Sequence, residues 1–270
     1  MPGVKIIGLA PEHEEIYCQC LEEWSDEIRE AGDHKREWYE RHKGRGLRVK
    51  LAVDDQGTVG GMIQYLPIEQ SPAAGAGLFF ILCIWVHGHK QGRGNFQKKG
   101  MGTALLEAAE ADARELGGKG MAAWGVMLPF WMRASWFRKH GYRKADRLGM
   151  MALMWKPFTA NIAAPSWIRP KMRPQPEDGK VVVTGLLNGW CPAMSMVHER
   201  ARRAAAELGP RVEFREIRTD DREVFLEWGM ADALFIDGKE MRNGPPPRYE
   251  VIRKKIARRL EKVKSKRCEK

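Results

Sequence analysis

A glycine-rich stretch between an apolar segment and a predicted helix is the part of this sequence best suited to bind a charged ligand. The apolar segment covers residues 78–86, the stretch covers 87–102, and alanine and leucine recur at helical spacing from Thr103 to about residue 116. Where a buried strand passes through glycines into a helix, free backbone N–H groups and the positive end of the helix dipole point towards an anion. Glycine also permits positive φ angles and a close approach of the backbone to the ligand. The pattern therefore predicts a phosphate-binding loop.

Two common phosphate-binding patterns do not describe this stretch. A Walker loop requires Gly-x-x-x-x-Gly-Lys-Ser/Thr, which residues 87–102 do not contain. A Rossmann loop follows the first strand of a βαβ unit, whereas two β-like runs at 48–53 and 60–65 precede this loop. Because a turn signal at 54–57 joins those runs, we expect antiparallel strands before the loop instead.

The last part of the stretch resembles the signature of the GNAT N-acetyltransferase family. Residues 97–102 read Gln-Lys-Lys-Gly-Met-Gly and match the family's Gln/Arg-x-x-Gly-x-Gly/Ala pattern. The strand end Cys-Ile-Trp-Val at 83–86 precedes it. The segment Trp-Phe-Arg-Lys-His-Gly-Tyr at 136–142, which follows it, is similar to the family's YxKxGF. The resemblance spans residues 1 to about 158.

The resemblance implies a mixed α/β (α+β) fold, the acyl-CoA N-acyltransferase fold, over residues 1–158. It also implies that an acetyl group passes directly from acetyl-CoA to a primary amine, without a metal. The residues implied to contact CoA lie at the strand end and in the loop: Ile84, Val86, Gln97, Lys98, Lys99, Gly100, Met101, Gly102 and Thr103. The acceptor is a small-molecule or peptide amine that these residues do not identify further.

Two departures from the family pattern concern the loop and the proton transfers. Residues 91–96 form a second, imperfect copy of the signature, which we interpret as an insertion that covers the cofactor or shapes the acceptor site. Phe137 stands where family members often have a tyrosine that protonates the departing thiolate. The candidates for catalysis are therefore His87 as base and Tyr142 as acid, with His89, His140 and Tyr65 as alternatives.

The segment ahead of the two β-like runs is predicted to be a strand followed by helix. Residues 4–9 fit a strand, and one helix should carry Ile16, Leu21, Trp24 and Ile28 on its apolar face. Cys18 and Cys20 would then point to different faces of that helix and make a poor metal pair.

The second half begins after a proline-rich linker at 159–179. Residues 180–263 resemble a thioredoxin-like domain of the YoaP-like kind found behind some GNAT proteins, and a basic tail follows at 264–270. Cys191 occupies the place of the first cysteine of Trp-Cys-x-x-Cys, but Met194 replaces the second, and Ala233 stands where thioredoxins have a cis-proline. A dithiol cycle is therefore excluded. A reactive Cys191 thiol in a redox-linked binding protein is the alternative function.

Composition restricts the remaining possibilities. The 43% of hydrophobic residues are typical of a folded protein, and no apolar run approaches the ~20 residues of a membrane span. With no secretory signal and an odd number of cysteines, five, we expect a cytoplasmic protein without a membrane partner. Much of the net charge of +11 lies in the last helix and tail, where a solvated helix face explains it without nucleic acid. The sequence predicts no oligomeric state.

Overall fold

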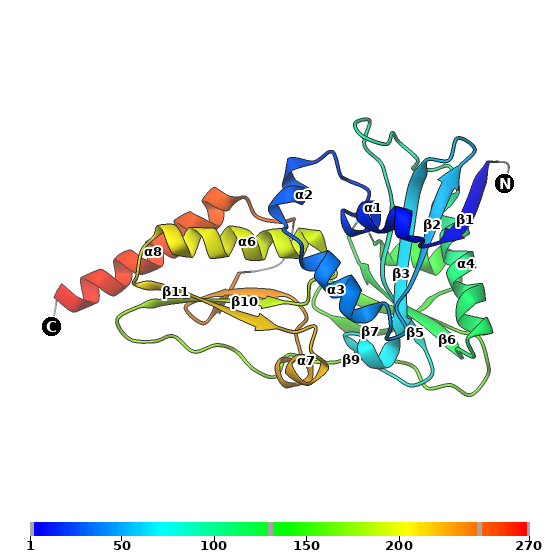
Figure 1. The fold of residues 1–270 in the computed structure, drawn as a ribbon. Helices are drawn as coiled ribbons and strands as arrows, with labels where there is room; N and C mark the ends of the chain where they lie inside the picture. The colour runs from blue at the N-terminus through cyan, green and yellow to red at the C-terminus, as the bar shows by residue number, and fades with distance from the viewer. Residues whose placement is uncertain (1–2, 129–131, 242–244, 269–270) are drawn as a thin grey trace. The chain divides into compact units, whose positions relative to one another are not determined.

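The computed structural model describes residues 3–128, 132–241 and 245–268, with side chains as far as Val263 (Figure 1). The chain divides into two compact units. The first contains Met1–Trp24 and Tyr39–Arg169, and the second contains Ser25–Trp38 and Pro170–Lys270. The second unit therefore includes a short excursion from the N-terminal half, which no feature of the sequence had indicated.

The first unit is built on a seven-stranded sheet in the order β1-β2-β3-β5-β6-β8-β7. Neighbouring strands are antiparallel except β5 and β6, which are parallel. The strands are β1 (Val4–Gly8), β2 (Arg48–Asp54), β3 (Val59–Pro67), β5 (Phe79–Val86), β6 (Gly120–Val126), β7 (Arg143–Leu148) and β8 (Met151–Pro157). The hairpin predicted before the loop is β2 and β3, and the apolar segment is the central strand β5.

Short helices and one long helix accompany this sheet. They are η1 (Pro11–His13), α1 (Glu14–Cys18), η2 (Ile68–Gln70), α4 (Met101–Glu115) and α5 (Ala134–Lys139), and the residues of α3 (His34–His42) are shared between the two units. A two-stranded ribbon joins β4 (Ala73–Ala74) to β9 (Ser166–Trp167). The green helix α4 in Figure 1 packs its apolar side, including Leu105 and Ala109, against the sheet.

A buried carboxylate also ties α4 to the sheet. Asp112 accepts hydrogen bonds from Arg48 Nη2 at 2.7 Å, Lys50 Nζ at 2.9 Å and Tyr65 Oη at 2.6 Å. Burial alone would raise the pKa of Asp112, but the bonds from Arg48, Tyr65 and Lys50 outweigh it and hold the pKa well below its usual value. The ionised carboxylate therefore fixes the middle of α4 over β2 and β3.

The helix predicted around Ile16 and Leu21 is interrupted. Cys20 and Leu21 both adopt positive φ angles, 51° and 63°, which end α1 and turn the chain. The Leu21 N–H bonds back to the Ile16 carbonyl at 2.9 Å, and Leu21 itself is fully buried. Trp24 therefore lies after a turn rather than on a continuous helix face, because a buried anchor overrides the helical spacing.

The second unit has a four-stranded sheet in the order β11-β10-β12-β13. Strand β10 is parallel to β11 and antiparallel to β12, and β13 is antiparallel to β12. The strands are β10 (Val181–Leu187), β11 (Val212–Arg218), β12 (Ala233–Ile236) and β13 (Lys239–Glu240), and the helices are α2 (Asp26–Glu30), α6 (Pro192–Glu207), α7 (Arg222–Trp228) and α8 (Tyr249–Cys268).

Helices cover both faces of this smaller sheet. Helices α6 and α8 lie side by side and share one apolar core with β10 and β12, in which Ala201 and Ile256 are fully buried (Figure 1). A second cluster around Phe235 occupies the opposite face, with Trp228 of α7 packed against it. The excursion joins this unit through Arg200, whose Nε lies 2.7 Å from a Glu30 carboxylate oxygen.

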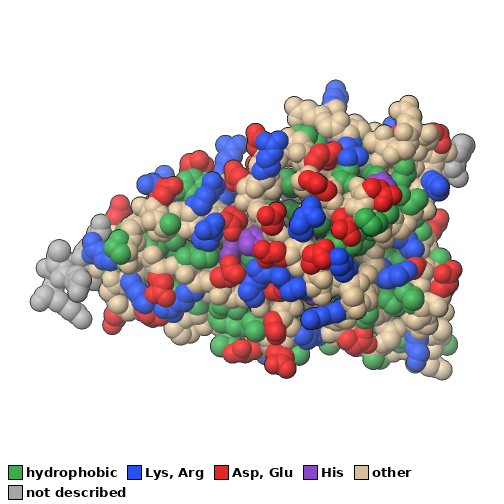
Figure 2. Space-filling view, in the orientation of Figure 1, with side chains coloured by type: hydrophobic (Ala, Val, Ile, Leu, Met, Phe, Trp, Pro, Cys, Tyr) green, Lys and Arg blue, Asp and Glu red, His purple; other side chains and the backbone are tan. Residues whose placement is uncertain are grey.

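On the face seen in Figure 2, basic and acidic side chains are interspersed. Part of the positive charge of α8 is paired with acidic side chains. Arg253 and Arg259 lie 3.1 and 2.6 Å from Glu207 and Asp237 oxygens. Among the residues that the structure describes, none of the helices combines the length and apolarity needed to cross a bilayer.

Candidate active site

The central strand β5 separates from its parallel neighbour where the candidate residues begin. Pairing joins Phe79–Ile81 to Met121–Ala123, whereas β5 continues to Val86 beside β3 alone. Trp124 of β6 reaches back across the opening, and its indole N–H donates to the Leu82 carbonyl at 2.7 Å. Within the described residues, one edge of the last part of β5 therefore has no strand partner.

A β-bulge marks the same point on the other edge of β5. Gln64 pairs with Cys83 and Tyr65 pairs with Ile81, so Leu82 is an extra residue. Such bulges bend a strand and re-aim its backbone groups, and they are frequent beside active sites. The bulge therefore lies at the point where β5 and β6 stop pairing.

The loop that follows β5 leads directly into α4. Helix α4 begins at Met101, and Gly100 caps it with φ +85°, an angle that side chains rarely adopt. Lys98 also has a positive φ of 64°, and the Gln97 N–H bonds to the Asn95 side chain at 3.0 Å. The first N–H groups of α4 have no partner within the helix and point towards this loop. Gln97 and Lys98 are exposed beside them, whereas Met101 is buried in the core.

The strand end, the first turn of α4 and the late segment of the unit meet at Gly102. A methyl group added at Gly102 would lie 3.7 Å from Val86 Cγ2 and 3.5 Å from Trp136 Cζ2. The next residue, Thr103, is hydrogen-bonded through its hydroxyl to His140 Nε2 at 3.1 Å. The structure therefore brings together three segments that the sequence had singled out separately.

His87, the predicted base, is buried and fully engaged. The Trp24 indole N–H donates to His87 Nε2 at 3.0 Å, so that nitrogen carries no proton. The other ring nitrogen, Nδ1, is then the donor to the Gly94 carbonyl at 2.6 Å. In this arrangement neither nitrogen can take a proton from an amine, and His87 instead fastens the inserted segment 87–96.

Other contacts hold that inserted segment against the sheet. Phe96 is buried on Gly60, where an added methyl group would lie 2.5 Å from Phe96 Cγ. Gly92 touches the Trp24 ring so closely that a methyl group there would come within 2.0 Å of it. Residues 87–96 are therefore packed against the rest of the first unit. Their role in covering the cofactor or shaping the acceptor site stays a prediction.

The tyrosine candidates occupy packed positions. Tyr142 is buried edge-to-face on Phe137 with ring centroids 5.4 Å apart. Burial, and then the neighbouring Glu110, raise the pKa of Tyr142 well above its ordinary value. Glu110 lies eight residues beyond Gly102, or ~12 Å along α4, which puts Tyr142 away from the helix start. Tyr65 donates its hydroxyl to Asp112 at 2.6 Å.

Comparison with known proteins agrees with this geometry. The model of the acetyltransferase (GNAT) family matches residues 11–142. Residues 11–142 are therefore similar to the GNAT family. The matched residues include α1, the strands β2 to β6, the loop and α5. No curated protein in the comparison matches the chain.

Several solved structures of GNAT proteins are similar to part of this chain at low identity. A protein of the family from Desulfovibrio desulfuricans is 19% identical with a TM-score of 0.44, covering 58% of this chain and 99% of its own. A family member from Brucella melitensis in complex with acetyl-CoA is 17% identical, with a TM-score of 0.41 and coverage of 60% and 92%. One from Escherichia coli in complex with CoA is 13% identical, with a TM-score of 0.44 and coverage of 62% and 91%.

Outside the GNAT unit, Cys191 is the residue of chemical interest. It is the N-cap of α6 and is half-buried. The loop before it is held by Asp232, whose carboxylate accepts the Asn188 N–H at 3.0 Å. Burial raises the pKa of Asp232 to about 7, although that hydrogen bond opposes the shift. The described residues contain no cis peptide bond, so Ala233 does not reproduce the cis-proline of thioredoxins.

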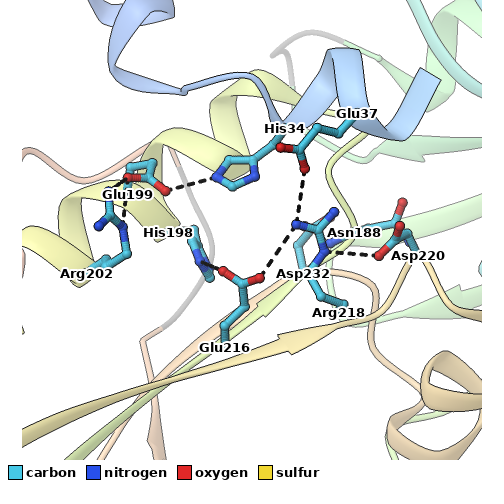
Figure 3. Close-up of polar contacts among 10 residues, drawn as sticks. All are labelled: His34, Glu37, Asn188, His198, Glu199, Arg202, Glu216, Arg218, Asp220 and Asp232. Carbon is cyan, nitrogen blue, oxygen red and sulfur yellow. Dashed lines mark hydrogen bonds and ion pairs between the residues drawn. The ribbon is translucent and has the colours of Figure 1, made fainter. Parts of the chain in front are cut away.

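Figure 3 shows two separate sets of polar contacts in the second unit. His34 Nε2 lies 2.9 Å from Glu199, and His198 Nε2 lies 2.8 Å from Glu216, which in turn is 3.6 Å from Arg218. The two imidazole rings stand 5.7 Å apart. His198 is buried, and this burial lowers its pKa despite the favourable contact with Glu216. The contacts hold the excursion onto α6 and the sheet.

Sequence reasoning missed one group of the GNAT unit. Trp24, Trp85 and His89 form an aromatic cluster at the end of β5, with Glu22 at its side. Trp24 had been placed on a helix face, and only the turn at Leu21 brings it here. Among the described residues, no group of three or more histidine, cysteine or acidic side chains is arranged to hold a metal ion.

Proposed function

We propose that this chain is an N-acetyltransferase that moves an acetyl group from acetyl-CoA directly to a primary amine. The observation that carries the proposal is the meeting of the separated strand end and the start of α4 at Gly102. The match of residues 11–142 to an acetyltransferase family supports the same reaction.

The CoA pyrophosphate is assigned to the start of α4. Backbone N–H groups from Gly100 to Thr103, together with the helix dipole, suit two adjacent phosphates. Gln97, Lys98 and Lys99 add an exposed donor and two cations at the same loop. Met101 contributes through its backbone, since its side chain is buried in the core.

The thioester is assigned to the opening between β5 and β6. The pantetheine arm would lie along the unpaired edge of β5 and make backbone hydrogen bonds with Ile84 and Val86. An N–H from Ile84 would stabilise the oxyanion that forms when the amine attacks. This assignment uses the edge of β5 that has no strand partner after Ile81.

Transfer requires the ammonium form of the acceptor to lose a proton first. We propose that His89 accepts this proton, because His87 is engaged on both ring nitrogens. His89 is exposed, and its Nε2 lies 3.7 Å from Glu22. The amine lone pair then forms the N–C bond. The C–S bond breaks with its electron pair on sulfur, and the second amine proton goes to the thiolate or to water. A thiolate needs little help from an acid, which accords with the buried position of Tyr142.

The second unit is proposed to be thioredoxin-like in fold without dithiol chemistry. The parallel pair β10 and β11 with β12 and β13 antiparallel beside it, and α6 leading from β10, support that fold. Met194 in place of the resolving cysteine argues against the redox-linked alternative. The cytoplasmic location stays a prediction from composition.

Two measurements test the proposed function. Isothermal titration should give a saturable heat with acetyl-CoA, and a thiol reagent should detect CoA release when a panel of primary amines is added. A chain that binds acetyl-CoA but releases no thiol with any amine would contradict N-acetylation. A chain that does not bind acetyl-CoA would contradict the cofactor assignment.

A further inference from the structure

A histidine at the end of α5 is bonded to the first turn of α4. His140 caps α5 and is half-buried. Its Nε2 lies 3.1 Å from the hydroxyl oxygen of Thr103, 37 residues away in the chain, and its Nδ1 lies 2.9 Å from the Trp136 carbonyl oxygen. The imidazole also packs on the Trp136 indole, with ring centroids 4.2 Å apart.

The end of α5 determines which nitrogen of His140 carries a proton. The His140 backbone N–H bonds to the Phe137 carbonyl at 3.0 Å, so the side chain satisfies the Trp136 carbonyl four residues back. A carbonyl oxygen can only accept, and Nδ1 is therefore the donor in that contact. In a neutral ring Nε2 then has no proton, and it accepts the hydrogen bond of the Thr103 hydroxyl.

The Thr103 hydroxyl lies beside the groups to which the pyrophosphate is assigned. Thr103 is the third residue of α4, and helix side chains tilt towards the start of their helix. While His140 is neutral, the single hydroxyl proton of Thr103 is committed to Nε2. The hydroxyl then presents only lone pairs to a phosphate oxygen, which is itself an acceptor.

Protonation of the imidazole would reverse this hydrogen bond. Both nitrogens of an imidazolium are donors, so Nε2 would donate to the Thr103 oxygen and leave the hydroxyl proton for a phosphate oxygen. The positive charge would lie at most about 6 Å from that oxygen, the sum of two hydrogen-bond lengths. The Trp136 ring and the last carbonyls of α5 are both suited to a neighbouring cation.

The charged groups around this pair are mostly cations. Those within four positions of Thr103 or His140 are Lys99, Glu107, Arg138, Lys139, Arg143 and Lys144. Lys156 of β8, which lies beside Gly141, is paired with Glu110 at 2.8 Å. No carboxylate among the described residues forms an ion pair with His140, whose polar contacts there are Thr103 and Trp136. The anion that would favour an imidazolium at this place is therefore the pyrophosphate of the ligand.

Resting on the proposed function, we propose that His140 and Thr103 link the binding of CoA to the uptake of a proton. His140 takes a proton from solvent when the cofactor binds and donates from Nε2 to Thr103, whose hydroxyl donates to the pyrophosphate. His140 is thus a positioning residue that acts through Thr103. Because the bound state holds the extra proton, affinity for the cofactor rises as the pH falls through the range in which histidine side chains gain charge.

Dephospho-CoA is the probe that tests this inference. Its pyrophosphate keeps its charge between about pH 6 and 8, whereas the 3′-phosphate of CoA gains a proton near the lower limit. Isothermal titration should give a Kd about fivefold lower at about pH 6 than at about pH 8. Titrations in two buffers of different ionisation enthalpy should show proton uptake on binding. His140→Gln should remove both effects, and His13→Gln, on η1, is the matched control that should keep them.

The outcomes separate this inference from the proposed function. Saturable binding with equal Kd at both pH values, or a pH effect that survives His140→Gln, would overturn the inference and leave the cofactor site supported. A chain that does not bind dephospho-CoA or acetyl-CoA at either pH would overturn both. If His140→Gln does not fold, Thr103→Val decides, because valine keeps the branched shape but lacks the hydroxyl. It should lose most of the gain in affinity at the lower pH, and an unchanged gain would overturn the inference.

Discussion

Replacing Gly102 by aspartate should weaken acetyl-CoA binding about 30-fold without harming the fold. A side chain at this position meets only ordinary contacts, at 3.5 Å from Trp136 and 3.7 Å from Val86. An acidic residue in the first turn of a helix is favourable by roughly 0.3–1 kcal/mol, and glycine inside a helix is unfavourable. The thermal midpoint of Gly102→Asp should therefore equal or exceed that of the unaltered protein.

The loss of affinity follows from charge repulsion at the start of α4. A carboxylate about 4 Å from one phosphate charge costs roughly 4 kcal/mol at an effective dielectric constant of about 20. Gly102 is only half-buried, and solvent screening reduces this cost to about 2 kcal/mol. The Kd for acetyl-CoA should then rise about 30-fold.

Gly102→Ala is the matched control, because it adds the same first carbon without the charge. Isothermal titration should show a Kd for Gly102→Ala within a few-fold of the unaltered protein. Gly100 is a poor site for the same test, since its φ of +85° would strain any side chain and confound binding with folding. Equal affinities for Gly102→Asp and Gly102→Ala would refute the placement of the pyrophosphate.

Three further changes test what stabilises each unit by itself. Asp112→Asn should lower the free energy of unfolding of the GNAT unit by about 2 kcal/mol, measured by urea titration, because a neutral amide loses charge-assisted bonds to Arg48 and Lys50. Gly60→Ala should cost about 1–3 kcal/mol in the same titration, because the new methyl group collides with buried Phe96. The second unit should lose stability as the pH falls below about 6.5, by up to about 1.4 kcal/mol per pH unit, since burial lowers the pKa of His198 and the unfolded chain binds that proton more tightly.

Each of these expectations has its own contrary result. Asp54→Asn, at the last residue of β2, is the control for Asp112→Asn. Equal losses of stability in the two variants would contradict a special role for the buried network around Asp112. For Gly60, the neighbouring turn variant Gly57→Ala should strain the backbone without touching Phe96, so only Gly60→Ala should alter acceptor kinetics through the inserted segment. In His198→Gln the loss of stability below pH 6.5 should be weaker, and an unchanged pH profile would exclude His198 as its source.

The sequence alone determined the elements whose signals are local. Residues 78–86 are apolar throughout, which indicates a strand covered on both faces, and β5 is the central strand of the sheet. The glycines of residues 97–102 mark a helix start because only glycine tolerates the φ of Gly100 at low cost. The GNAT resemblance rested on these same residues, and the family match confirms it.

Only the tertiary structure decided which groups are available for chemistry. His87 looked suitable as a base from its position, but Trp24, 63 residues away in the chain, occupies its Nε2. The break of the first helix goes with the burial of Leu21. The inclusion of Ser25–Trp38 in the second unit depends on distant partners, because Arg200 contacts Glu30 and Glu199 contacts His34. Contacts between residues far apart in the chain do not alter the periodic pattern of the sequence. The spacing therefore indicated the candidate histidines, but it could not show which of them has both ring nitrogens engaged.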